Sequence, residues 1–289
     1  MLTATPAYRL ALPQTHKREF TFAAYTPDTG ELLTPAGGVP IGGGQVTAQL
    51  ASRVTRSASW TCSDEWFPVA DTDPLSPYQS IVKISAGIGY PTGEREVFEV
   101  FTGRVYSANR SENGQVTFRA DDLAAEVLVH DFEAPLRARK NGSCLAEMHR
   151  LILDGWQWAT FGTDIVIDAK MPELAWDDDR GKALDDLAAV MGARWYTLGN
   201  GKFVVRSNTY TDLTPVIQLI DGESGTLTGA TTSVTADGAY NSVVVTSERP
   251  DGGNPLVAIE RNVNSLSAAR YGGRFGKRVK KVRAQSALT

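Results

Sequence analysis

Hydrophobic and polar positions change period most clearly between residues 181 and 207, where a helical pattern is followed by strands. Lys182, Asp185 and Asp186 fall on one helix face, which we expect to be solvated. Replacing Asp185 with Ala is therefore expected to change the free energy of unfolding by less than about half a kcal/mol. The apolar residues recur at three- and four-residue spacing and predict a buried opposite face, made of Ala183, Leu184, Leu187, Ala188 and Met191.

The ends of this helix have their own signals. Asp177, Asp178 and Asp179 supply carboxylates for the N-cap and the first turn, which suit the positive end of the helix dipole. Gly192 stands where a left-handed C-terminal residue is needed. Metal binding by the three aspartates is disfavoured, because they lack the alternation and the downstream Glu of a calcium loop.

A hairpin is predicted directly after the helix. Residues 194–198 and 202–206 form its strands, and Asn200 and Gly201 lie between them. Asn-Gly fits a type I′ turn because both residues tolerate positive φ, so we expect both to adopt it. The helix and hairpin together are too small to be stable alone, and they need apolar partners from elsewhere in the chain.

A second helix precedes this unit. Ser143 is its predicted N-cap, Gly155 ends it, and residues 164–169 predict a following strand. Its apolar positions are Leu145, Met148, Leu151 and Ile152. Together with the hairpin, these elements predict an α+β middle domain at residues 131–207.

Residues 1–130 predict a mostly antiparallel β-domain, a sandwich or a barrel, with an N-terminal arm. The Gly- and Pro-rich residues 26–44 predict a long loop. A turn at residues 113–114 makes a hairpin, and residues 121–122 start a short closing helix over 123–128. The strands alternate at period two, and we place them at residues 19–25, 45–60, 81–88, 97–108 and 115–120.

Residues 208–289 predict a second β-domain. A short strand is expected at 216–220, followed by a hairpin of residues 241–248 and 256–261 with its turn at 250–253. The tail then alternates basic residues with valines and predicts a basic edge strand. It ends without a closing element, so we expect this domain to be incomplete at the C-terminus.

Composition places the chain among ordinary globular proteins. A hydrophobic content of 42% and a charged content of 21% allow buried cores, and 289 residues correspond to two or three domains. The sequence has no apolar run of about 18 residues, and its first residues do not have the pattern of a signal peptide. The net charge of −4 gives no general reason to expect nucleic-acid binding.

Residues with catalytic or metal-binding chemistry are scattered. His16, His130 and His149 have no ligand at a metal-binding offset, and His149 is expected at the edge of a core. Cys62 and Cys144 are expected to be buried, reduced thiols. The sequence holds no nucleophile elbow, P-loop or dinucleotide fingerprint. We therefore expect no catalytic residue, no metal site and no cofactor.

Two enzymatic or binding alternatives rest on composition. Asp64 and Glu65 lie beside Trp60 and Trp66, in the way that carboxylates and aromatic rings occur in glycosidase grooves. Six tryptophans could also form sugar-binding platforms, although most fall on apolar faces that favour core packing. A carbohydrate-binding module and a cell-wall glycoside hydrolase therefore remain open.

The basic tail is the candidate interaction site. One interpretation is a solvated basic edge that prevents strand-to-strand aggregation. Another is contact with an acidic protein partner or with passing nucleic acid, and we expect the tail to face a protein partner. The candidate residues are Lys277, Arg278, Lys280, Lys281 and Arg283.

Several segments, taken in order, resemble baseplate-hub (tail-tip hub) proteins of long-tailed bacteriophages and of related contractile injection machines. They correspond to the first β-domain, the helix with its hairpin and the start of the second β-domain. The similarity covers most of the chain from about residue 40. The segments are residues 101–105, 116–122, 181–206, 241–245, 258–262 and 271–272.

This resemblance implies a mainly β (α+β) chain, in which two tail-tube-like antiparallel β-barrel or sandwich domains flank a small α+β domain. It implies a homotrimer, whose six similar β-domains make a pseudo-sixfold ring on the tail tube. The N-terminal arm and the loop at residues 26–44 are then expected to reach across a subunit boundary or along the tube.

The resemblance also implies a structural and non-catalytic role at the virion tail tip, for a protein made in the bacterial host cytoplasm. The implied partners are a tail tube or distal tail protein, a tape measure protein and a central spike or fibre protein. DNA passes through the ring without specific binding, and no membrane span is expected.

Overall fold

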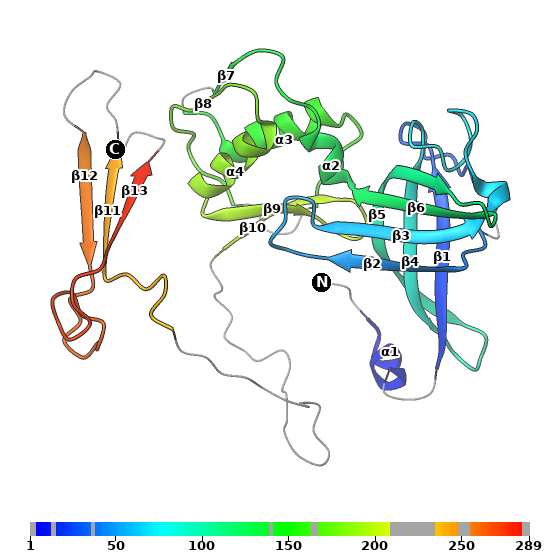
Figure 1. Ribbon diagram of the computed structural model, residues 1–289, viewed down its shortest axis with the longest axis horizontal. Coiled ribbons are helices and arrows are strands. Elements are labelled where there is room, and N and C mark those ends of the chain that lie inside the picture. The colour runs from blue at the N-terminus through cyan, green and yellow to red at the C-terminus, as the bar shows by residue number, and fades with distance from the viewer. Residues whose placement is uncertain are drawn as a thin grey trace. The chain divides into compact units, whose positions relative to one another are not determined.

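The computed structural model describes residues 4–12, 16–35, 38–138, 141–162, 167–208, 235–247 and 255–284. The chain divides into two compact units. The first comprises residues 1–136, 142–170 and 176–208, and the second comprises residues 137–141, 171–175 and 209–289. Strands outnumber helices in the described chain, which is mainly β with a small helical part, as the sequence predicts (Figure 1).

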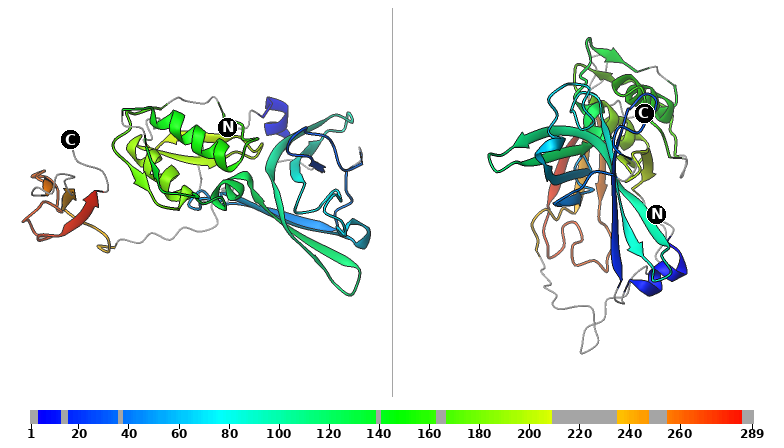
Figure 2. Two further views of the ribbon diagram at one scale, coloured as in Figure 1. Left: turned by 90° about the horizontal axis from the view of Figure 1, so that it is seen from above. Right: turned by 90° about the vertical axis from the view of Figure 1, so that its right-hand side faces the viewer.

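A six-stranded antiparallel sheet with the order β1-β4-β5-β6-β3-β2 forms the body of the first unit. It twists and curls into an open half-barrel (Figures 1 and 2). β1 lies at one edge, which confirms the strand predicted at residues 19–25. A short helix α1 (Pro6–Ala11) precedes the sheet, and a 3₁₀ turn η1 (Asp64–Trp66) follows β3. The strands are β1 (Lys17–Tyr25), β2 (Gly43–Ala48), β3 (Arg56–Ser63), β4 (Ile81–Gly89), β5 (Arg95–Arg110) and β6 (Gln115–Asp122).

Aromatic residues fill the core on one face of this sheet. The Trp60 ring stacks on Phe118 with the ring centroids 5.3 Å apart. The ring centroid of Phe22, from β1, lies 4.8 Å from that of Trp60, from β3. Along β3 and β6, buried residues alternate with more exposed ones, which confirms the period-two pattern. Stacking and burial of these rings contribute apolar contact inside the curl, together with buried aliphatic residues such as Val82 and Val116.

Three helices and a hairpin complete the first unit. α2 (Leu123–Leu128) contacts β5 and β6 as well as α3 (Cys144–Gly155) and α4 (Arg180–Val190). The hairpin consists of β9 (Ala193–Thr197) and β10 (Phe203–Ser207). Two short strands, β7 (Leu136–Arg137) and β8 (Ala175–Trp176), pair with each other.

The helix caps are those that the sequence predicts. Asp122, Ser143 and Asp179 are the N-caps of α2, α3 and α4, and each side chain accepts a hydrogen bond from a backbone N–H in the first turn. Gly192 after α4 has a φ of 60°, as predicted. The predicted apolar face of α4 is buried, with Leu187 fully inside.

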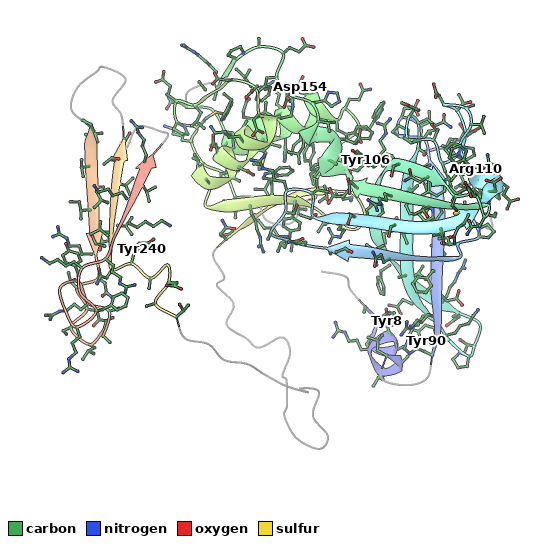
Figure 3. The ribbon with its side chains drawn as sticks, viewed as in Figure 1. Tyr8, Tyr90, Tyr106, Arg110, Asp154 and Tyr240 are labelled. Atoms are coloured by element: carbon green, nitrogen blue, oxygen red, sulfur yellow. The ribbon has the colours of Figure 1, made fainter. Side chains whose placement is uncertain are left out.

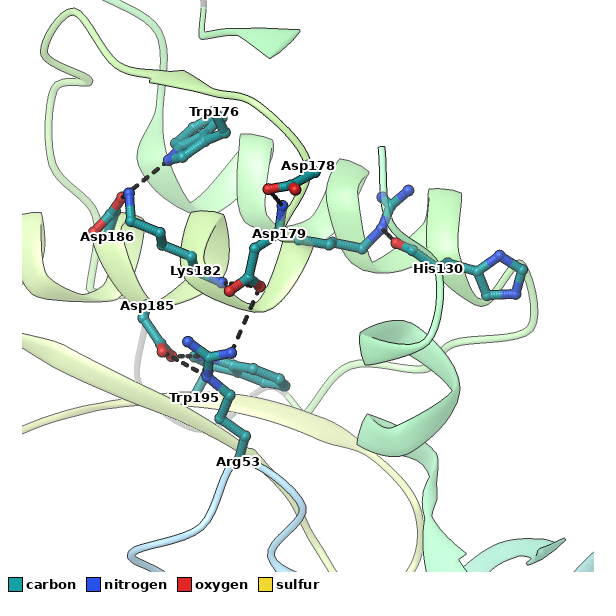
Figure 4. A network of polar contacts seen from close by, with 10 residues as sticks. Arg53, His130, Trp176, Asp178, Asp179, Lys182, Asp185, Asp186 and Trp195 are labelled. Atoms are coloured by element: carbon teal, nitrogen blue, oxygen red, sulfur yellow. Dashed lines mark hydrogen bonds and ion pairs between the residues drawn. The ribbon is translucent and has the colours of Figure 1, made fainter. Parts of the chain in front are cut away.

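The acidic face of α4 is less solvated than the sequence predicts. Trp195 Nε1 donates to Asp185 Oδ1 at 2.9 Å, and Trp176 Nε1 donates to Asp186 Oδ2 at 3.0 Å (Figure 4). Arg53 also donates to Asp185, at 2.8 Å. The carboxylates therefore satisfy two indole N–H groups that the core would otherwise leave without acceptors.

The turn between β9 and β10 differs from the predicted type. Gly201 has a φ of 78°, whereas Asn200 has no positive φ, so the type I′ prediction is wrong. Gly201 N donates to Leu198 O and Leu198 N donates to Lys202 O, both at 2.9 Å. These bonds define a longer, bulged turn in which a single left-handed glycine matches the twist of the strands.

The second unit contains a three-stranded sheet with the order β12-β11-β13. β11 (Ser242–Ser247) pairs antiparallel with β12 (Leu256–Arg261), which confirms the predicted hairpin. β13 (Val279–Ala284) confirms the basic edge strand and pairs parallel with β11. The predicted strand at 216–220, the turn at 250–253 and part of the strand at 164–169 lie outside the described residues, and the described residues 167–169 form no strand.

Replacing Gly201 with Ala is expected to lower the free energy of unfolding by more than about 2 kcal/mol, because the new Cβ would lie 2.8 Å from Thr102 Cγ2 and would also be strained at positive φ. Gly192→Ala is the matched control, because it meets nothing within 4 Å and should lower it by about 1 kcal/mol. Chemical denaturation measures both. Equal losses would show that packing against Thr102 contributes nothing.

Replacing Leu187 with Ala is expected to lower the free energy of unfolding by about 2 to 5 kcal/mol, because the site is fully buried. Asp185→Ala should lower it by about 1 to 3 kcal/mol, since it leaves the Trp195 N–H without its acceptor. The control Lys182→Ala, on an exposed side chain of the same helix, should change it by less than about half a kcal/mol. If Asp185→Ala lowered the free energy of unfolding as little as Lys182→Ala does, the acidic face of α4 would be solvated, as the sequence predicts.

Candidate protein-interaction surfaces

The structure places three of the five candidate basic residues in β13 and divides them between the two faces of its sheet. Lys280 lies opposite Val243 of β11, whereas Lys281 and Arg283 lie opposite Val244 and Thr246. Residues that pair across a ladder share a face of the sheet, and successive residues of a strand alternate. Lys281 and Arg283 therefore lie on one face of the sheet and Lys280 on the other.

Three of the basic residues pack on aromatic rings of their own unit. Lys277 Nζ lies 5.6 Å from the centroid of Tyr271, and the Arg278 guanidinium lies 4.4 Å from that of Phe275. Lys280 Nζ lies 5.8 Å from the centroid of Tyr240, which Figure 3 labels. These cation–π contacts hold the three residues in place around the start of β13.

Asn241 holds the residues just before β13 in place, and sequence reasoning missed this role. This buried side chain accepts a hydrogen bond from Arg278 N at 2.8 Å through Oδ1 and donates to Gly276 O at 2.8 Å through Nδ2. Arg278 also donates to Ala236 O at 2.9 Å. The position of Asn241 directly before a strand rich in β-branched residues was the available signal, because the short amide side chain of an Asn there can bond to the backbone of a neighbouring turn.

The edge strand β2 is a second candidate surface. Gln49 N donates to Thr55 O, and by antiparallel alternation the backbone groups of Gly44, Val46 and Ala48 point away from β3. All six residues of β2 are exposed, and none is charged or a proline. The edge thus has none of the side-chain features that usually block pairing with another strand.

The opposite edge of the sheet is partly covered by the long loop. Leu33 N donates to Ala24 O at 2.8 Å, and Ala24 N donates to Thr34 Oγ1 at 3.2 Å. Leu32 forms a bridge with Tyr25. The two edges of the half-barrel are therefore unequal, and β2 is the more open of them.

The N-terminal arm contacts the first sheet of its own chain. Thr5 donates to the Glu96 carboxylate through N at 2.9 Å and through Oγ1 at 2.6 Å, and Tyr90 Oη donates to it at 2.9 Å. These hydrogen bonds lower the pKa of Glu96. The Tyr8 ring meets Phe98 edge-on with the centroids 5.1 Å apart, and Figure 3 labels Tyr8 and Tyr90.

The carboxylates proposed for a glycosidase groove have structural partners. Asp64 forms an ion pair with Arg110, which Figure 3 labels, and the Arg110 guanidinium lies 5.7 Å from the centroid of Phe67. Glu65 accepts a hydrogen bond from Ser63 at 2.8 Å. Across the described residues, no group of three or more His, Cys, Asp or Glu has an arrangement that could hold a metal ion.

The cysteines and His149 occupy the predicted kinds of place. Cys62 and Cys144 are buried and free, and burial raises the pKa of the Cys62 thiol to about 11. His149 is half-buried and stacks on Phe161 with the ring centroids 3.9 Å apart. Burial lowers the pKa of His149, because the charged imidazolium would lose its hydration.

Among the helices of the described residues, none combines the length and the apolar composition needed to cross a membrane.

Solved structures define the class of fold. No family model matches the chain, and no curated protein sequence matches it. The chain is similar to the tail protein from Neisseria meningitidis MC58, with a TM-score of 0.56 and 14% identity over 93% of this chain and 72% of that one. The 43 kDa tail protein of prophage MuSo2 from Shewanella oneidensis gives a TM-score of 0.53 and 14% identity over 93% and 74%.

A third solved structure has a related fold. A chain of the Francisella PdpA–VgrG complex gives a TM-score of 0.50 and 12% identity over 94% of this chain and 46% of that one. At these identities the comparisons establish the fold. This protein has the mainly β fold of phage tail proteins, as its resemblance to tail-hub segments implies.

Acidification is expected to lower the stability of the first unit in part through His149. Its folded-state pKa lies below the ordinary value of 6.5, so the unfolded chain binds more protons there and the free energy of unfolding falls as the pH falls below 6.5. His149→Gln should make that fall shallower between about pH 7 and pH 5, as measured by urea denaturation. His130→Gln, at an exposed histidine, is the control, and identical slopes for native protein and His149→Gln would contradict the prediction.

Proposed function

We propose that this chain is a structural hub protein of a phage tail tip or baseplate. Three copies form a pseudo-sixfold ring that continues the tail tube and anchors the tail-tip proteins. The supporting observation is the tail-protein fold, which extends over 93% of the chain and therefore includes both β-rich parts. Two β-rich parts in each of three copies would present six similar surfaces to a hexameric tube.

The open edge of β2 supports assembly with another copy. Its outward backbone groups at Gly44, Val46 and Ala48 are available for pairing, and Val46 keeps 36% of its surface exposed on the core side of the sheet. A strand from a neighbouring copy would satisfy these groups and extend the apolar face. Ring closure removes such free edges from every copy at once.

The functional division that we propose follows three segments. Residues 1–130 form the first tube-like domain with its arm and loop, residues 131–207 form the α+β domain, and residues 208–289 belong to the second tube-like domain. The helices of the α+β segment pack in the same compact unit as the first sheet, which supports its role as a rigid insert.

The proposed partners are a tail tube or distal tail protein, a tape measure protein and a central spike or fibre protein. The protein would act in the virion at the tail tip, with DNA passing through the ring during ejection into the host cell. The proposed role is non-enzymatic. It is supported by the tail-protein fold and by the structural partners of Asp64 and Glu65.

The receptor-binding and hydrolase alternatives have less support. A sugar-binding surface needs exposed aromatic rings, but only small fractions of four of the six tryptophans are exposed: Trp60, Trp156, Trp176 and Trp195 are all buried in the first unit. A hydrolase needs a pair of available carboxylates, and Asp64 is paired with Arg110.

The expected oligomer is a trimer with three times the 31.2 kDa mass of the chain, measured by light scattering coupled to size exclusion. Val46→Pro should convert it to monomers, because proline removes an outward N–H needed by an added strand and leaves the β2–β3 hydrogen bonds in place. Val46→Ala retains the N–H and should remain trimeric. Monomeric native protein at high micromolar concentration would refute the ring, and a trimeric Val46→Pro variant would exclude the β2 edge from the interface.

A further inference from the structure

Charge is segregated along the chain. Residues 261–289 contain eight of the 29 Lys and Arg residues and none of the 33 Asp and Glu residues. The remaining 260 residues therefore carry a clear acidic excess, although the net charge of the whole chain is only −4. Such segregation within one chain favours contacts between its basic and acidic parts in an assembly.

The basic residues meet apolar residues on one face of the second unit's sheet. Lys281 pairs with Val244, which pairs with Ile259 across the other ladder, so these side chains share a face. By the same register that face holds nine residues. Its six exposed residues, here termed the cationic face, are Arg261, Lys281 and Arg283 with Val257, Ile259 and Val279.

The cationic face is open within the part of the unit that the structure describes. Val257 has 57% of its surface exposed, Ile259 has 51% and Val279 has 41%. A sheet of three strands with such exposed apolar residues is marginal alone, because burial of one face normally provides its stability. The combination of valine, isoleucine and cations is typical of a protein-binding surface with charges at its rim.

An acidic counterpart lies on the first unit around the buried Arg180. Arg180 Nε donates to His130 O at 2.6 Å, and its Nη1 pairs with Asp154 Oδ2 at 2.8 Å. Phe132 N donates to Asp178 O at 2.9 Å. These contacts bring three segments together, and their exposed carboxylates and apolar residues, here termed the acidic patch, are Asp131, Glu133, Asp154, Asp177 and Asp178 with Val129 and Leu153.

The acidic patch has the features that a cationic sheet face requires. Arg180 is 4% exposed and forms an ion pair with Asp154, while the five acidic residues of the patch stay exposed to solvent. Val129 keeps 72% of its surface exposed and Leu153 keeps 41%, which provides apolar contacts between the charges. Figure 3 labels Asp154, and Figure 4 labels Asp178 and His130.

We propose that the cationic face of one copy docks on the acidic patch of a second copy of this chain. This proposal rests on the proposed ring, for which it identifies a contact besides the β2 edge. Charge complementarity identifies the occupant: three cations meet five carboxylates, and apolar residues lie within both surfaces. Nucleic acid would satisfy the cations but would leave Val257 and Ile259 exposed.

Cross-linking between two differently labelled copies tests the contact. One variant carries Lys281→Cys and the other carries Glu133→Cys, and both retain the buried Cys62 and Cys144. The two are mixed, denatured, refolded together and treated with a short bis-maleimide. We expect a covalent heterodimer, identified by different affinity tags, and at least tenfold less of it when Glu112→Cys, an exposed site on the β5–β6 turn, replaces Glu133→Cys.

Charge reversal gives an independent measurement. Lys281→Glu with Arg283→Glu, and separately Asp177→Lys with Asp178→Lys, should each weaken self-association at least tenfold, and 0.5 M salt should weaken the native assembly in the same direction. Mixing the two reversed variants should restore association. The paired variants carry opposite charge changes, so a general effect of net charge would not produce this restoration.

The outcomes separate this contact from the proposed ring. A native trimer without the heterodimer, or without the effect of charge reversal, would overturn the contact while the ring stands. A cross-link that forms only within a single chain carrying both cysteines would overturn it as well. Native protein that stays monomeric would overturn both proposals.

Discussion

A single buried carboxylate, Asp122, joins the sheet of the first unit to its helices. Its Oδ2 accepts hydrogen bonds from Thr55 N at 2.9 Å, from Thr55 Oγ1 at 2.8 Å and from Arg56 N at 2.8 Å. Its Oδ1 accepts from Ala124 N at 3.1 Å. A carboxylate with no exposed surface is tolerated only where such donors replace water. This one carboxylate therefore fixes the positions of the start of β3, the end of β6 and the first turn of α2 relative to one another.

The same chain segment extends this constraint to α4 and its hairpin. Arg56 Nη1 donates to the carbonyl of Thr197, a fully buried residue of β9, and Arg53 pairs with Asp185 of α4 at 2.8 Å. The loop between β2 and β3 is thus held at both the sheet and the helices. Since β2 ends where this loop begins, its open edge is fixed before any partner arrives. A preorganised edge loses less conformational entropy on pairing, which favours assembly.

Local signals made much of this fold predictable, and contacts between distant segments account for what was missed. The N-cap Asp179 lies three residues from the N–H that it binds, and period-two alternation predicted most strands. The acceptor role of Asp185 depends on Trp195, which the next strand brings back over the helix. The turn at Gly201 packs on Thr102, about a hundred residues earlier. Likewise, the five basic residues were visible in sequence, but the partners that Lys280, Lys281 and Arg283 face depend on the parallel pairing of β13 with β11, which no local period encodes.

The proposed pairing of charges has a consequence for a ring that DNA crosses. Each phosphate that a wall of Lys and Arg neutralises adds salt-dependent affinity, so an exposed basic lining would retain the DNA. In the proposed assembly the cations Arg261, Lys281 and Arg283 are covered by carboxylates of a neighbouring copy. The remaining surface comes mainly from the acidic part of the chain. The contact that joins the copies would then also withdraw the strongest phosphate-binding groups from the conduit, and one segregated charge pattern would serve assembly and DNA passage together.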